Sequence, residues 1–206
     1  MSRVVTEWRR RRIDQVVQAR LAGLAVVCEN LHNPHNAAAI LRTCEALGVL
    51  NVYVVEEDRP FSPARGVTQG AEKWVRVHRF RRVERALGAI AQAGYALYAA
   101  VPGEGGLCPE ELPCAQPLAL AFGAEDAGLS DQLMAAAAGT FHIPMWGFTQ
   151  SLNVSVAAAI AVYVCGQARR RGLGDRGDLD PAEAASLRGR YRDLSIPARG
   201  RPQEAG

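Results

Sequence analysis

The pattern of apolar and polar positions divides the chain into strands and helices that alternate. Short apolar runs, several of them rich in β-branched residues, predict strands at residues 24–28, 51–55, 74–77, 96–100, 118–122 and 140–143. Apolar residues at helical spacing predict helices at residues 37–47, 83–92, 131–138 and 154–171. Strands and helices that alternate in this way are typical of an α/β fold, with a mainly parallel sheet and helices on both faces.

Segments of a different character flank this core. Residues 6–21 combine an apolar stripe at helical spacing with a block of arginines at 9–12, which predicts a basic helix packed on the rest of the protein. Beyond Gly172 the chain is rich in Pro, Gly and Arg. There, residues 181–194 are predicted as a short helix and about the last ten residues as disordered. The expected division is a basic N-terminal helix (1–22), a central α/β domain (23–172) and a C-terminal extension (173–206).

The composition is that of a soluble globular protein with one ordinary domain and appendages: 206 residues, 49% hydrophobic and 22% charged. Of the 24 basic residues only Lys73 is lysine, and the net charge is +3. The planar guanidinium of arginine suits phosphate and nucleic acid. A GC-rich coding bias is the better explanation of the arginine excess, since Ala and Gly are also abundant. Composition alone therefore only suggests an RNA partner.

The cysteines and the apolar runs indicate a protein of the reducing cytoplasm. Five cysteines form no Cys-x-x-Cys pair, so neither a disulfide framework nor a zinc site is predicted, although Cys108 and Cys114 could bridge if oxidised. The Arg-rich N-terminus has no apolar stretch behind it and is unlike a secretory signal. The longest apolar run, residues 154–165, is too short to span a bilayer. We expect a cytoplasmic protein with no membrane partner.

The first of three polar motifs is residues 33–49. Pro34 favours an extended residue before it and a helix soon after, and Asn36 is predicted to cap that helix. Arg42 then lies almost two turns into a helix whose buried side is apolar. A lone arginine there must reach the surface or occupy a polar pocket. On these residues alone, a capping Asn and a solvated Arg are the favoured interpretation.

The second motif, residues 122–130, follows a buried strand. Gly123 lets the backbone approach a ligand at the carboxyl edge of the sheet, and Glu125 and Asp126 come just after it. A turn between a strand and a helix uses the same residue types. From these residues alone, a binding loop and a plain turn are equally supported.

The third motif, residues 143–157, runs from a short strand through a Pro/Gly turn into a helix of small apolar residues. Ser151 and Asn153 lie two positions apart at the entrance of this helix. A helix N-terminus offers free backbone N–H groups, and such places bind ligands in α/β folds. Ser is also a routine N-cap residue. Each motif is weak alone, and the combination of the three is a strong indication of a site.

In their order and separations, the three motifs resemble the signature motifs of the SpoU branch of the SPOUT RNA 2′-O-methyltransferases. Residues 9–13, 24–49 and 70–75 add a likeness to the tRNA guanosine-18 2′-O-methyltransferase group. The resemblance covers residues 9–172 and is weakest at 56–68 and 101–117. It implies a fold whose C-terminal segment threads a deep trefoil knot, which general rules of chain topology would not predict.

The resemblance also implies a cofactor and a set of site residues. Members of the family bind S-adenosylmethionine in a bent shape against the knot, and they act as homodimers with the active site near the subunit boundary. The positions that match cofactor contacts are Ala100, Val101, Gly123, Ile143, Met145 and Leu152. The positions that match catalytic residues are Arg42, Asn36, Glu125, Ser151 and Asn153. No metal is expected, because a sulfonium is already an activated methyl donor.

Among these positions, Arg42 matches the residue to which the family assigns activation of the ribose 2′-hydroxyl. Arginine stays protonated in proteins, so a simple general-base role does not suit it. We expect Arg42 to bind a phosphate beside the target ribose and to stabilise the developing alkoxide. A phosphate oxygen or water would accept the proton of the 2′-hydroxyl. Asn36 is expected to orient the ribose or Arg42. The pocket would be completed by Glu125, Ser151 and Asn153.

Two arginine blocks, at residues 9–12 and 169–171, flank the central domain in sequence. Both predict contacts to RNA phosphates, which give affinity and salt dependence without reading the base sequence. The alternative for each block is a solvated surface.

The sequence thus predicts a tRNA ribose 2′-O-methyltransferase that acts on guanosine 18 of the D-loop, with tRNA and a second copy of the chain as partners. Within the same class, the substrate could be ribosomal RNA or another tRNA position. A knotted RNA-binding protein without catalysis is a different class, and the five matching catalytic positions argue against it. A nucleotide-binding Rossmann oxidoreductase is disfavoured, because no Gly-x-Gly-x-x-Gly follows the first strand.

Overall fold

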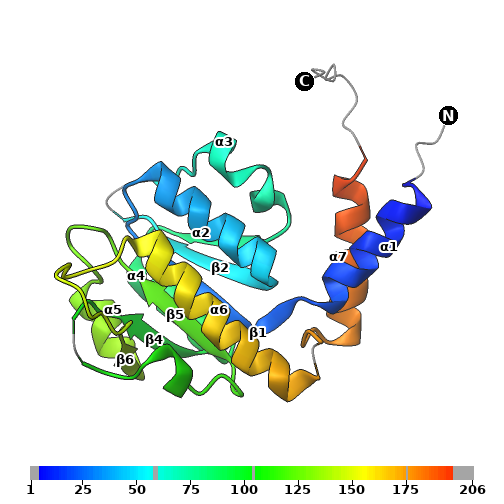
Figure 1. Ribbon diagram of the computed structural model, residues 1–206. Helices are drawn as coiled ribbons and strands as arrows, with labels where there is room; N and C mark the ends of the chain where they lie inside the picture. Colours follow the sequence, from blue (N-terminus) through cyan, green and yellow to red (C-terminus); the bar gives the residue numbers. More distant parts are fainter. Residues whose placement is uncertain (1–4, 58–59, 104, 175, 197–206) are drawn as a thin grey trace.

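One sheet of six strands forms the centre of the protein, and the computed structural model describes residues 5–57, 60–103, 105–174 and 176–196. The strand order is β3-β2-β1-β5-β4-β6, and the neighbouring strands pair in parallel (Figure 1). The strands are β1 (Leu21–Glu29), β2 (Val49–Val55), β3 (Arg76–Phe80), β4 (Ala96–Ala100), β5 (Leu118–Phe122) and β6 (Gly139–Phe141). The predicted α/β fold with a parallel sheet is confirmed.

The two edge strands differ from the sequence prediction. The strand predicted at 74–77 begins only at Arg76, because a short 3-10 helix, η1 (Ala71–Lys73), occupies the chain before it. The strand predicted at 140–143 ends at Phe141, where the chain leaves the sheet for the loop before α6 (Val154–Leu173). An edge strand pairs on one side only, so its apolar pattern is a weaker guide to its ends.

Helices cover both faces of the sheet, as predicted. On one face α2 (Pro34–Leu47) packs against α6, and their apolar side chains meet Val26 and Cys28 of β1. On the other face α4 (Val83–Gln92) and α5 (Asp131–Ala136) pack on Ala25 and Val27. Alternate residues of β1 therefore belong to two separate apolar layers. This explains why the strand is buried almost throughout, as a central parallel strand must be.

The observed start of α2 corrects the predicted cap residue, and the observed end of α2 confirms the predicted one. Asn33, rather than Asn36, caps the helix: its side-chain oxygen accepts from the backbone N–H two residues later at 2.9 Å. Pro34 takes the first helical position, where its fixed φ suits the helix and its missing N–H is not needed. Asn36 therefore lies inside the first turn. The helix ends at residue 47, as predicted, because Gly48 follows it in the left-handed conformation with φ 86°.

The predicted N-terminal and C-terminal helices form one unit. Figure 1 shows α1 (Glu7–Gln18) and α7 (Pro181–Leu194) side by side at one end of the molecule. The buried apolar cluster that joins them consists of Ile13, Val17, Leu50, Leu187 and Tyr191. The apolar stripe predicted on the first helix thus packs against the last helix. The terminal residues predicted to be disordered, from 197 onward, lie outside the described part of the chain.

A buried arginine joins this helical unit to the sheet domain. Arg20 is 1% exposed, and its guanidinium donates to the hydroxyl of Tyr191 and to the carbonyl oxygen of Trp74, each at 3.1 Å. It also donates to the backbone carbonyl and the carboxylate of Glu45, near the end of α2. A buried charge requires such partners, because an unpaired one would be strongly destabilising. Arg20 therefore fixes α7 against α2.

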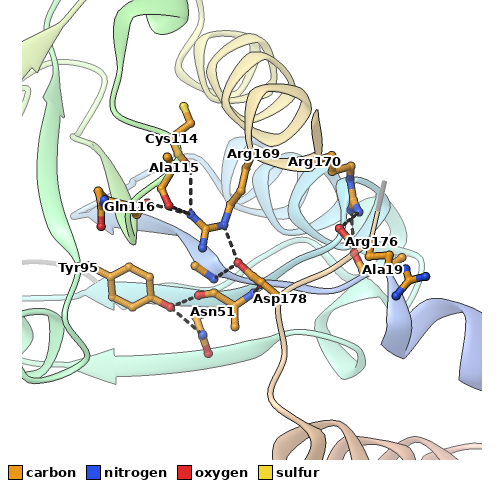
Figure 2. A network of polar contacts seen from close by, with 12 residues as sticks. Ala19, Asn51, Tyr95, Cys114, Ala115, Gln116, Arg169, Arg170, Arg176 and Asp178 are labelled. Carbon is orange, nitrogen blue, oxygen red and sulfur yellow. Dashed lines mark hydrogen bonds and ion pairs between the residues drawn. The ribbon is translucent and has the colours of Figure 1, made fainter. Parts of the chain in front are cut away.

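A second polar network holds the segment before α7 on the sheet (Figure 2). The carboxylate of Asp178 accepts from Arg169 Nε at 2.5 Å and from two backbone N–H groups at the start of β1. Arg169 also donates to the carbonyl oxygens of residues 114–116. Beside them, burial raises the pKa of Tyr95 to about 12, so its hydroxyl stays protonated and donates to the carbonyl oxygen of Ala22.

These contacts correct the prediction that residues 169–171 form an RNA-binding block. The side chain of Arg169 is 10% exposed and is engaged inside the protein. Arg170 donates to the carbonyl oxygens of Ala19, at 2.7 Å, and Leu47, at 3.1 Å. Arg171 alone of the three is exposed. Two of the three guanidinium groups are therefore occupied by bonds within the protein.

The remaining short elements are α3 (Arg65–Thr68), in the loop after β2, and η2 (Pro109–Glu111), in the loop before β5. The five cysteines, all within the described residues, are free thiols. Within the same part of the chain, the structure contains no helix with the length and apolar character needed to cross a membrane.

Candidate active site

A cavity of about 610 Å³ opens at the carboxyl ends of β4, β5 and β6. Its walls come from three loops: residues 100–103 after β4, residues 122–128 after β5, and parts of the segment 141–157 between β6 and α6. In parallel α/β sheets, ligands bind at this edge, outside the carboxyl ends of the strands. The volume suits a small organic molecule or cofactor.

The loop after β5 is a tight turn that requires its glycines. The backbone groups of Ala124 and Gly128 bond to each other in both directions, at 2.9 and 3.0 Å. A Cβ on Gly123 would lie 2.1 Å from the carbonyl oxygen of Gly128, and Gly128 itself has φ 71°. The sequence supports a plain turn and a binding loop equally. In the structure, the same residues form a turn and a wall of the cavity.

All six residues predicted to contact a cofactor line this cavity: Ala100, Val101, Gly123, Ile143, Met145 and Leu152. They come from three loops that the parallel sheet brings to one edge. The set combines apolar side chains with loop backbone, which suits a ligand that has both a ring and polar edges. Their role as cofactor contacts stays a prediction.

Three of the five predicted catalytic residues also line the cavity: Glu125, Ser151 and Asn153. Asn36 connects two of these. Its side-chain nitrogen donates to Glu125 Oε1 at 2.5 Å, and its side-chain oxygen accepts from Asn153 Nδ2 at 3.1 Å. We call these three residues, Asn36, Glu125 and Asn153, the Asn36 network. Because Asn36 is only 7% exposed, the network fixes the orientation of two side chains at the cavity wall.

The N-terminus of α6 is capped by Asn153 and not by Ser151. The side-chain oxygen of Asn153 accepts from the backbone N–H of Ser155 at 2.9 Å and from its hydroxyl at 2.6 Å. The other end of the same amide donates to Asn36. Asn153 thus links the helix entrance to the Asn36 network, while Ser151 lies exposed in the loop before the helix.

Arg42 is the predicted catalytic residue that the fold of one chain does not bring to the cavity. It lies on α2 with an exposed side chain, almost two turns after Asn36. At about 100° per residue the two side chains leave different sides of the helix. Among the described residues, those that line the cavity do not include Arg42.

Two further contacts join the loops after β1 and β5, and neither is predicted from the sequence. Glu29, the last residue of β1, is 1% exposed and accepts from the backbone N–H and the hydroxyl of Ser130, at 2.8 and 2.7 Å. His32 Nδ1 lies 3.5 Å from Asp126 Oδ1. A carboxylate that ends an apolar strand is a signal that could have pointed to Glu29. His32 has no such signal, because the pairing of β1 with β5 is not visible in the sequence.

An apolar stripe is exposed along α6 and the loop before it. Its members on or beside the helix are between 36% and 56% exposed and recur at helical spacing: Leu152, Val156, Ile160 and Tyr163. In the loop, Trp146 and Phe148 are 94% and 109% exposed. Large apolar side chains gathered on one surface indicate a binding face.

Comparison with known proteins identifies relatives over most of the chain. The SpoU rRNA Methylase family matches residues 23–163. The chain is 40% identical to the tRNA (guanosine(18)-2′-O)-methyltransferase of Thermus thermophilus over 177 aligned residues. The aligned region covers 85% of this chain and 91% of that protein. The crystal structure of the A. aeolicus TrmH/SpoU tRNA modifying enzyme matches with a TM-score of 0.80 and 31% identity, over 93% of this chain and 98% of that one.

A fourth similarity concerns the fold alone. The SpoU methyltransferase AviRb of Streptomyces viridochromogenes, solved in complex with AdoMet, matches with a TM-score of 0.66 and 23% identity, over 75% of this chain and 62% of that one. All three polar motifs, at 33–49, 122–130 and 143–157, lie inside the family match. The resemblance predicted from these motifs is confirmed, and the chain belongs to the SpoU rRNA Methylase family.

Proposed function

We propose that this protein transfers a methyl group from S-adenosylmethionine to the ribose 2′-hydroxyl of guanosine 18 in the D-loop of tRNA. The observation that carries the proposal is the Asn36 network at the wall of a cavity, in a chain 40% identical to an enzyme named for that reaction. Each of the three sequence motifs contributes one residue to this network. A tRNA substrate would place the protein in the cytoplasm.

The cavity fits S-adenosylmethionine in size and lining. Gly123 has no room for a Cβ beside Gly128, so the tight turn that forms this part of the cavity wall requires a glycine there. Ile143, Met145 and Leu152 provide apolar surface for an adenine ring. When bound, the cofactor supplies an activated methyl group on its sulfonium. AviRb, which shares the fold, was solved with this molecule.

The polar residues of this chain would hold the ribose and its phosphate. The Asn36 network presents the carboxylate of Glu125 at the cavity, and a carboxylate has further lone pairs for ribose hydroxyl groups. The exposed hydroxyl of Ser151 lies on the same cavity. Arg42 would bind a phosphate next to the target and stabilise the negative charge that develops on the attacking oxygen.

A second copy of the chain would complete the site. The apolar stripe on α6 is exposed in the single chain, and a twofold partner that presents the same stripe would bury both. α2, which carries Arg42, packs beside α6. A partner docked on α6 would therefore lie near Arg42. In such a homodimer, Arg42 of the partner subunit would face the cavity, which accounts for its place outside the cavity of its own chain.

The proposal includes the trefoil knot of the family. The chain leaves β6, at one edge of the sheet, and contributes to the cavity whose other walls follow β4 and β5. It then forms α6, which packs on β5 and β1 in the middle of the sheet. This path, from an edge strand past two neighbouring loops to the sheet centre, is compatible with a C-terminal knot.

The helical unit of α1 and α7 would bind the body of the RNA. In this arrangement, residues 1–22 and 173–206 act together beside the catalytic domain, residues 23–172. Arg10 and Arg12 on α1 and Arg192 on α7 have exposed side chains. Their charge suits phosphate contacts that hold tRNA without reading its sequence.

Ribosomal RNA is the second candidate substrate, because the matching family is described as rRNA methylases. We prefer tRNA because the Thermus relative, which this chain matches along nearly its whole length, is named for tRNA. A knotted RNA-binding protein without catalysis is disfavoured by the intact Asn36 network.

The decisive experiment maps 2′-O-methyl groups in RNA from cells with and without the protein. We expect the methyl group at guanosine 18 of tRNA to disappear. Loss at a ribosomal position alone would replace tRNA by rRNA as substrate, and no loss anywhere would refute the proposal. In vitro, a tRNA transcript with 2′-deoxyguanosine at position 18 is the matched control, because it lacks only the accepting hydroxyl.

A further inference from the structure

The loop that follows β4 is bonded to both edges of β6. At the inner edge, the backbone N–H of Val101 donates to the carbonyl oxygen of Phe141 at 2.9 Å, which extends the pairing of β4 with β6. At the outer edge, which is also the edge of the sheet, Leu107 donates to the carbonyl oxygen of Thr140 and accepts from the backbone N–H of His142, both at 2.9 Å. The start of this loop lines the cavity that would hold the cofactor.

Two glycines precede Leu107, and both have backbone conformations that other residues rarely adopt. Gly105 has φ 145° and Gly106 has φ 80°. A Cβ on Gly106 would lie 2.3 Å from the carbonyl oxygen of Thr140, so only glycine lets the chain pass this close to β6. Glycine also loses more conformational freedom on folding than any other residue. The glycine pair therefore needs further contacts to keep one shape.

The side chain of His142 provides such a contact from the end of β6. Its Nδ1 lies 2.9 Å from the carbonyl oxygen of Gly105. A carbonyl oxygen only accepts, so the proton of this bond is carried by Nδ1. His142 is half-buried and itself lines the cavity, one position before the third sequence motif. One residue thus belongs to the cavity wall and holds the loop two positions before its backbone bonds at Leu107.

We propose that His142 is a positioning residue for S-adenosylmethionine: its bond to Gly105 holds the loop after β4 in the shape that forms one wall of the cofactor cavity. This inference rests on the proposed function. A wall that is ordered before the cofactor arrives costs less conformational entropy on binding. Loss of the bond should therefore weaken cofactor binding. The rate at saturating cofactor should stay the same, because His142 acts through the loop and not on the methyl group.

The variants that test this role differ in whether they keep the N–H donor. His142→Leu keeps an apolar side chain and removes the donor. His142→Asn keeps a donor at the place of Nδ1, because its amide nitrogen is the same number of bonds from the backbone. His35→Gln, which removes an exposed histidine of α2, is the matched control.

Calorimetry of the full chain with S-adenosylmethionine is the first measurement. The Kd should rise about 5-fold in His142→Leu, as expected for the loss of one hydrogen bond. It should stay close to the wild-type value in His142→Asn and His35→Gln. In a tRNA methylation assay of His142→Leu, the KM for S-adenosylmethionine should rise in parallel while kcat stays the same. Hydrogen exchange at the Leu107 amide should be faster in His142→Leu alone, because the loop opens more often.

A His142→Leu protein with the wild-type Kd would overturn the inference. So would a His142→Asn protein as weak as the leucine variant, because the donor would then have no effect, and so would a lower kcat with an unchanged KM. If circular dichroism shows that His142→Leu does not fold, His142→Ala replaces it with the same expected result. A wild-type chain that binds S-adenosylmethionine but methylates no RNA would overturn the proposed function, and the Kd values would still test His142. A wild-type chain that does not bind S-adenosylmethionine would overturn both.

Discussion

Asn36 Nδ2 donates to Glu125 Oε1 at 2.5 Å, and the two residues are 89 positions apart in the chain. The bond depends on the parallel pairing of β1 with β5, which carries the loops after these strands to the same edge of the sheet. Asn36 also accepts from Asn153, so one buried amide joins the first, second and third sequence motifs. The motifs therefore act as one unit, and changes to them should not be independent.

Substitutions within the Asn36 network should be strongly coupled. We expect Asn36→Ala and Glu125→Ala each to reduce kcat, because each removes an orienting hydrogen bond at the cavity wall. The double variant should be no slower than the poorer single variant, since residues in one hydrogen-bond network have coupling energies of about 0.5–3 kcal/mol. Steady-state kinetics of the four proteins measures this cycle. Effects that simply add would contradict the idea of one unit.

Arg42→Ala should abolish methyl transfer and leave cofactor binding nearly unchanged. The side chain lies on α2, outside the cavity that would hold the cofactor. Loss of one group that stabilises developing charge costs about 100-fold or more in rate. A methylation assay paired with calorimetry on S-adenosylmethionine separates the two effects. Near-normal turnover in the variant would remove Arg42 from the mechanism.

Ile160→Glu should dissociate the proposed homodimer. The residue lies in the middle of the exposed stripe on α6, and a buried carboxylate there would be unpaired. Sedimentation at micromolar concentration should show twice the chain mass for the wild type and a single chain for the variant, with loss of activity. Ala185→Glu, on an exposed position of α7, is the matched control. A monomer with full activity would rule out a shared site.

Arg10→Gln combined with Arg12→Gln should weaken tRNA binding and reduce its salt dependence. Of the four arginines at residues 9–12, the structure leaves these two as the candidates for phosphate contacts. Arg9 donates to Ser195 and lies over the ring of Trp74, and Arg11 pairs with a carboxylate within α1. Loss of two phosphate contacts should lower the slope of log K against log salt by about 1.5.

Filter binding at several salt concentrations measures that slope. Cofactor affinity is the internal control and should not change, because the cavity is built from residues beyond 99. If the double variant binds tRNA with an unchanged slope, α1 is only a solvated helix, and the RNA footprint lies elsewhere.

Asp178→Asn should loosen the C-terminal extension from the sheet. The carboxylate is 11% exposed and pairs with Arg169, so its loss leaves a largely buried guanidinium without its counter-ion. We expect the free energy of unfolding to fall by about 3 kcal/mol. Urea unfolding measures the change, and Glu7→Gln in the exposed pair with Arg11 is the control, with an expected loss below about 0.5 kcal/mol. Equal losses in the two variants would show that the contacts of Asp178 do not hold the C-terminal extension on the sheet.

The local pattern by itself determines most of the elements of this protein. It predicts α4, β4, β5 and α7 with the bounds that the structure has, because their apolar spacing and flanking turns are unambiguous. It also identifies the motifs, and all six predicted cofactor residues reach one cavity. At the start of α2 the pattern predicts the wrong cap, Asn36 in place of Asn33, because Pro34 lets the helix begin earlier. At the start of α6 the pattern does not decide whether Ser151 or Asn153 is the cap.

The tertiary structure alone decided which polar residues meet. Arg169 and Arg170 look like exposed phosphate ligands in sequence, but the docking of the C-terminal extension turns both into internal donors. The contact between His32 and Asp126 exists only because β1 and β5 are neighbours in the sheet, while Arg42 leaves α2 on another side from Asn36. The physical reason is the same in each case. Hydrophobic spacing along the chain specifies which side of an element is buried, whereas the partner of a polar group depends on which elements pack together.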